Sequence, residues 1–144
     1  MSIREDVASN IVTTLQAATT PVTPKLVTRE PFEFDEISNA QFPAILVQTA
    51  SESREDITIG DGSIRREGII TYQLLGYVKS STVDTARNNL IETIEEALDT
   101  DRTRNGNALD TQVVSIETDE GAIAPVGGII VTVEVMYNFV RGNT

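Results

Sequence analysis

The stretch IIVTVEVMYNFV, residues 129–140, decides the fold of this chain. Its side chains divide by strict alternation into two faces, and this period of two predicts a β-strand. The run is well above the usual five or six residues of a strand, which indicates a central strand or one that reaches beyond its own domain. One face carries Ile129, Val131, Val133, Val135, Tyr137 and Phe139, and the other carries Ile130, Thr132, Glu134, Met136, Asn138 and Val140.

Weaker strand signals precede this segment. Ala44–Val47 is continuously apolar and branched, which favours a short strand covered on both faces. Ile69–Val78 alternates, although Ile69, Leu75 and Tyr77 make its second face partly apolar as well. A short extended piece is expected at residues 26–28 and a further strand at residues 112–117.

Two segments have the period of a helix. Ile3, Val7, Ile11 and Leu15 recur every fourth residue and predict a helix over residues 3–18, with Ser2 and Glu5 as a capping box. The helix must end before Thr20-Pro21, because proline disfavours helical geometry in the preceding residue. A second helix opens at residues 81–84 and runs to Asp99, and its apolar stripe is Val83, Ala86, Leu90, Ile94, Ala97 and Leu98.

This order of elements predicts one α+β domain spanning residues 1–144. We expect a mostly antiparallel or mixed β-sheet with both helices packed on one face. The polar segment 50–67, with a glycine turn at residues 60–63, is expected to be a long loop or a hairpin arm.

The composition excludes most catalytic chemistry. The 144 residues contain no histidine and no cysteine, which rules out Ser-His-Asp and Cys-His sites, zinc centres and disulfides. We therefore assign no catalytic residue, no cofactor and no metal site, and we expect a protein that is not an enzyme. No apolar run approaches the roughly 20 residues of a membrane span, so no membrane partner is expected.

Two segments resemble ligand-binding motifs, but each lacks a residue that its motif requires. Gly60-Asp61-Gly62 resembles the start of a dinucleotide loop, but Arg65 replaces the third glycine and no helix follows. Residues 101–106 resemble the front half of a calcium loop, but Gln112 stands where the bidentate glutamate belongs. An Asn-Gly turn explains that segment more simply.

Two charged clusters are candidates for protein contacts. Arg54, Glu55 and Asp56 stand across the glycine turn from Arg65 and Arg66. These groups either pair within one hairpin or exchange ion pairs with a neighbouring copy, and surface pairs of this kind fix register more than strength. The acidic face at Glu92, Glu95, Glu96 and Asp99, together with Asp119 and Glu120, either keeps the chain soluble or repels DNA.

From Phe42 to the C-terminus, and in its opening helix, the chain resembles the tail terminator (tail-completion, minor tail protein U-like) family of long-tailed bacteriophages. The resemblance rests on residues 42–47 as the early strand, on residues 131–139 as the closing strand followed by Arg141, and on the second helix. The helix positions that carry it are Arg87, Leu90, Ile91, Ile94, Glu95, Leu98 and Asp99.

The resemblance implies a structural virion protein, assembled in the host cytoplasm, that forms a ring, commonly a hexamer. Such a ring caps the tail tube, ends tail growth and joins a head-tail connector or neck protein. Six copies, each with a net charge of −11, would carry −66, so DNA would pass without specific binding. The lumen would be lined by the acidic helix face or by Asp119-Glu120. The charged segment with Arg54, Glu55, Asp56, Arg65 and Arg66 would contact a neighbouring copy or the tail tube. A phage neck or head-completion protein, and an acidic monomeric module that binds a peptide by an edge strand, remain alternatives.

Overall fold

The computed structural model describes residues 3–33, 36–56, 65–106, 108–119 and 126–140, with only the backbone given for 55–56, 65–66 and 139–140. None of the described helices is long and apolar enough to cross a membrane. In chain order the elements are α1 (Ile3–Gln16), β1 (Leu26–Thr28), η1 (Asn39–Gln41), β2 (Ala44–Asp56), β3 (Arg65–Lys79), α2 (Val83–Asp99), β4 (Asp110–Thr118) and β5 (Val126–Val140).

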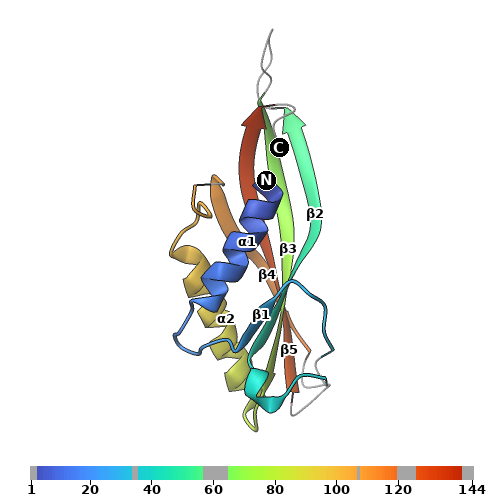
Figure 1. Cartoon of the computed structure of the whole chain (residues 1–144), viewed down its shortest axis with the longest axis vertical. Helices are drawn as coiled ribbons and strands as arrows, with labels where there is room; N and C mark the ends of the chain where they lie inside the picture. Colours follow the sequence, from blue (N-terminus) through green and yellow to red (C-terminus); the bar gives the residue numbers. More distant parts are fainter. Residues whose placement is uncertain (1–2, 34–35, 57–64, 107, 120–125, 141–144) are drawn as a thin grey trace.

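The strands form one five-stranded sheet in the order β1-β2-β3-β5-β4. Only β1 and β2 run parallel, and every other neighbouring pair is antiparallel. Both α-helices lie on the same side of the sheet, α1 over β1 and β2 and α2 over β3, β5 and β4 (Figure 1). The predicted α+β class, with two helices on one face of a mixed sheet, is confirmed.

The core lies between the helices and one sheet face. Alternation places the odd residues of β5, such as Val131 and Val133, opposite the even residues of β3, such as Tyr72 and Leu74, and all four are fully buried. The helices cover them with the fourth-residue stripes expected from the sequence, including Ile11 of α1. The long closing strand is therefore central, as its length indicated, because β3 and β4 flank it.

Three strands extend together beyond the start of α1 (Figure 1). β2 continues through the polar run 51–56, part of the segment that the sequence left open as a long loop or a hairpin arm, and its backbone pairs with β3 as far as Asp56 opposite Arg66. β3 pairs in turn with β5 over its whole length. These residues still form a strand because their backbone pairing with β3 is continuous. They can be polar because neither face of the sheet is fully covered there. The expected turn at 60–63 lies outside the described residues.

The lower part of β2 is covered on both faces, as its unbroken apolar run predicts. Ile45 and Val47 join the core under the helices, while Ala44 and Leu46 are buried on the opposite side. The chain between β1 and β2 covers that side, where Phe32 meets Tyr77 edge-on with ring centroids 5.8 Å apart. Within the part of the chain that the structure describes, no helix covers the remainder of this sheet face.

Arg104 ends α2. Its guanidinium is fully buried and donates hydrogen bonds to the carbonyls of Leu98, at 2.6 Å, and of Asp101. The last carbonyls of a helix lack internal partners and favour a cation, which the acidic C-terminal turn of α2 does not supply. Burial lowers the pKa of Arg104. The arginine therefore compensates a misfit that the sequence of α2 creates.

Replacing Arg104 with methionine should lower the free energy of unfolding by about 2–4 kcal/mol, because buried carbonyls lose their donor and packing is lost. Urea unfolding measures the loss. Arg102→Met is the matched control: Arg102 is half exposed in a surface ion pair with Asp110, so its loss should cost less than about 1 kcal/mol. Equal effects of the two substitutions would contradict the capping role.

Candidate assembly surfaces

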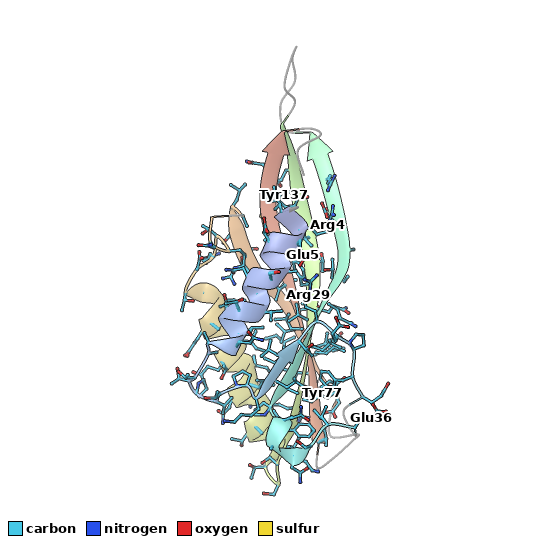
Figure 2. All side chains as sticks on the ribbon, viewed as in Figure 1. Arg4, Glu5, Arg29, Glu36, Tyr77 and Tyr137 are labelled. Carbon is cyan, nitrogen blue, oxygen red and sulfur yellow. The ribbon has the colours of Figure 1, made fainter. Side chains whose placement is uncertain are left out.

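A polar cluster joins the start of α1 to the extended strands. The Glu52 carboxylate accepts hydrogen bonds from Arg4 at 2.6 Å, from Arg54 at 2.7 Å and from the Tyr137 hydroxyl. Figure 2 shows Arg4 and Tyr137 converging at this point. The Tyr137 ring lies over Gly68, where an added Cβ would be 2.5 Å from the ring. Glu52, which the sequence did not single out, therefore fixes α1 against the extended strands.

Burial raises the pKa of Glu52, but the hydrogen bonds from Arg4, Tyr137 and Arg54 outweigh it and hold the pKa below its ordinary value. A carboxylate with a lowered folded pKa contributes stability that is complete above its unfolded pKa, here 4.5, and lost as the pH falls through the folded value. Glu52→Gln should therefore destabilise the protein at neutral pH, and its deficit should shrink in acid. Urea unfolding of both proteins between about pH 6 and pH 3 tests this, and parallel curves would contradict it.

The first predicted cluster is only partly described. Arg54 is half-buried and pairs with Glu52 on its own strand, which favours pairing within one copy at this position. The backbone register sets Asp56 opposite Arg66, Glu55 opposite Glu67, and Arg65 opposite Val140. The side chains of Glu55, Asp56, Arg65 and Arg66 lie outside the described residues, so a contact with a neighbouring copy stays a proposal.

The predicted acidic cluster divides in two. Glu92, Glu96 and Asp99 are exposed on α2, with Glu95 half-buried beside them. Asp119 is instead held at 2.5 Å by Arg87, whose side chain is only 8% exposed. Asp119 is thus the partner of a buried cation rather than an open acid on a channel wall. Glu120 lies outside the described residues.

The sheet presents two free edges. β1 covers the outer edge of β2 only along Ala44–Leu46, so we define residues 47–56 of β2 as the β2 edge. β4 ends the sheet on the other side, and its residues Asp110–Thr118 form the β4 edge. Among the described residues, no strand pairs with either edge. Sequence reasoning missed the β4 edge, although its signal was the failed alternation at Val113-Val114-Ser115-Ile116.

The β4 edge exposes apolar side chains. Val114 and Ile116 within the edge are 46% and 40% exposed, and Leu109 just before it is 53% exposed; these three are the large exposed hydrophobic residues of the described chain. A groove of about 600 Å³ lies beside this edge, lined by Leu75, Tyr77, Ile116 and Ile130 among others. An exposed edge strand without lysine or proline is a template for pairing with another chain.

The sheet face turned away from the helices is the bare face, and its middle consists of two polar rows. Register places Gln48, Gln73, Thr132 and Ser115 in one row, and Ser51, Thr71, Glu134 and Gln112 in the next. Neither row contains lysine or arginine. The middle of the bare face is therefore polar and weakly acidic, while the rows on either side of it carry Leu75 with Ile130 and Ile69 with Met136.

The described residues include the segment 101–106 and most of the acidic side chains. Among them, no group of three or more Asp, Glu, His or Cys is arranged to hold a metal ion. Residues 101–106 form a turn in which Asp101 accepts hydrogen bonds from the backbone amides of Thr103 and Asn105. These bonds and one from the Thr103 hydroxyl hold the pKa of Asp101 below its ordinary value.

Comparison with known proteins agrees with this picture. A chain of the solved structure "Virion of native gene transfer agent (GTA) particle" superposes with a TM-score of 0.54 at 8% identity, covering 95% of this chain and 98% of that chain. At that identity the match shows a shared fold alone. No curated protein sequence matches. The family model described as "Bacteriophage Tail Tube Terminator Protein" matches residues 1–143. The chain therefore belongs to the bacteriophage tail tube terminator protein family, a family of structural tail proteins and not of enzymes.

Proposed function

We propose that copies of this chain assemble into a ring, most simply a hexamer, that caps the phage tail tube and ends its growth. The observation that carries the proposal is the family match over residues 1–143. The exposed apolar edge of β4 supports it, because a chain that acts by self-assembly needs uncovered, pairing-competent surface. The capped end then receives a neck or connector protein of the DNA-filled head. Assembly takes place in the host cytoplasm and the product is part of the virion.

DNA passes through such a ring without specific binding. A net charge of −11 on each copy opposes the counterion release that drives phosphate binding. Two surfaces qualify as the channel wall: the acidic face of α2 at Glu92, Glu95, Glu96 and Asp99, and the bare face of the sheet. The buried pairing of Asp119 argues against the third surface, at Asp119-Glu120.

Removing the chain from the phage should produce tails longer than the normal length, since nothing then stops tube polymerisation. Electron microscopy of lysates measures the lengths, and purified chain added to growing tubes should restore a fixed end with a ring on it. Normal tails without heads attached, and binding of the chain to heads instead of tubes, would move the protein to a neck or head-completion role.

A further inference from the structure

We propose that the ring is closed by β-sheet pairing, in which the β4 edge of one copy pairs antiparallel with the β2 edge of the next copy. The inference rests on the proposed ring function and names the surface and the partner, a second copy of this chain. Neither edge has a strand partner among the described residues.

The two edges have the correct polarity. β2 and β4 run in opposite directions within the sheet, since β2 is antiparallel to β3, β3 to β5, and β5 to β4. Two copies placed side by side in the same orientation therefore bring β4 of one copy antiparallel to β2 of the other. No copy needs to be inverted, so the contact joins two different surfaces and repeats head to tail, as a ring requires.

The two edges also match in height and side-chain pattern. Thr49 lies level with Tyr72 of β3, Val133 of β5 and Val113 of β4, and each edge carries one bulge next to that level. At equal height Ile116 would face Val47 on the helix side, and Gln112 would face Ser51 on the bare side. The central stretches Thr111–Ile116 and Val47–Ser51 contain no charge, so no like charges oppose each other there.

Closure also selects the face that lines the channel. At the level of the pairing each copy contributes four strands, β2, β3, β5 and β4, so a six-copy ring has about 24 strands, and a spacing of about 4.8 Å gives a radius of about 18 Å. A helix layer about 10 Å further in would leave about 4 Å of circumference per helix, or about 7 Å if the strands tilt by about 40°. A helix needs about 10–12 Å. The helices therefore lie outside, and the bare face lines the channel.

Cysteine cross-linking tests the pairing, because the chain has no cysteine of its own. Ser51 and Gln112 are exposed and lie at one level of the bare face. The double variant Ser51→Cys, Gln112→Cys, treated on tail tubes with a bismaleimide spanning about 8 Å, should give a ladder of covalent oligomers up to the ring; that span tolerates a two-residue shift. Each single variant should remain monomeric on a denaturing gel.

Two outcomes overturn the pairing. A dimer from Gln112→Cys alone would show β4 paired with β4, and capped tubes without any ladder would show that other surfaces join the copies while the proposed function stands. If the wild-type chain neither forms rings nor caps tubes, the proposed function fails and the inference fails with it.

A charged side chain in the uncharged centre of the β4 edge gives an independent test. Val114→Lys should reduce ring formation on tubes by on the order of tenfold or more, because each interface would bury an unpaired ammonium group. Leu109→Lys is the matched control, since it replaces an equally exposed apolar residue just outside the strand. Both variants should keep the wild-type circular dichroism spectrum. Equal capping by the two variants would overturn the inference.

Discussion

Leu90→Ala is expected to lower the free energy of unfolding by about 3–5 kcal/mol, a large part of the stability of a domain this size. Leu90 is fully buried on α2, where it lies over Gly76 of β3. Truncation removes apolar contact and leaves a cavity between two rigid layers that cannot close. Thermal and urea unfolding, followed by circular dichroism, measure the loss.

The site beneath Leu90 provides a sharper form of this test. A Cβ added at Gly76 would lie 2.9 Å from Cδ2 of Leu90 and 2.7 Å from Cγ1 of Ile129, so Gly76→Ala alone should destabilise by overpacking. In the Leu90→Ala background the contact with Leu90 disappears, the two contacts with Ile129 remain, and the new methyl group occupies part of the cavity. We expect the double variant to be more stable than additivity predicts by about 1 kcal/mol or more. Strict additivity would show that the two side chains do not share one space.

The sequence predicted the layers of this fold because each depends on a local period. The alternation in residues 129–140 and the fourth-residue stripes of both helices reflect burial on one face, and burial is what these patterns record. The local pattern gives no strand signal where the side chains are no longer buried. Residues 51–56 are polar because little covers them, yet they are strand because β3 offers a continuous backbone ladder, which no local pattern reveals.

The candidate surfaces were harder to predict for a related reason. Charge runs identify exposed residues, but they do not show which charges are already paired, as Asp119 is by Arg87 and Arg54 is by Glu52. The free edges depend on strand order, which is a property of the whole sheet. Only after β4 is placed at the end of the sheet do the exposed Val114 and Ile116 acquire a meaning.

Glu134→Lys is expected to slow the release of DNA from purified particles and to lower infectivity on the order of tenfold or more, if the bare face lines the channel. Glu134 lies at the centre of the second polar row, on β5. In a ring of six copies the substitution changes the wall by about 12 charges and supplies six ammonium groups on long stems to bind passing phosphates. Because phosphate binding releases counterions, raising the salt concentration should restore the rate of release.

Two controls separate this effect from a loss of structure or of assembly. Glu134→Gln removes the carboxylate without adding a cation, so release should stay near the wild-type rate. Glu96→Lys makes the same change of charge on the exposed face of α2. If the helices lie outside the sheet, that substitution should leave release unchanged, since charges further from DNA than the screening length of about 8 Å act weakly at physiological salt. Salt-dependent slowing by Glu96→Lys but not by Glu134→Lys would place the acidic helix face in the channel instead and would reverse the orientation that edge pairing requires.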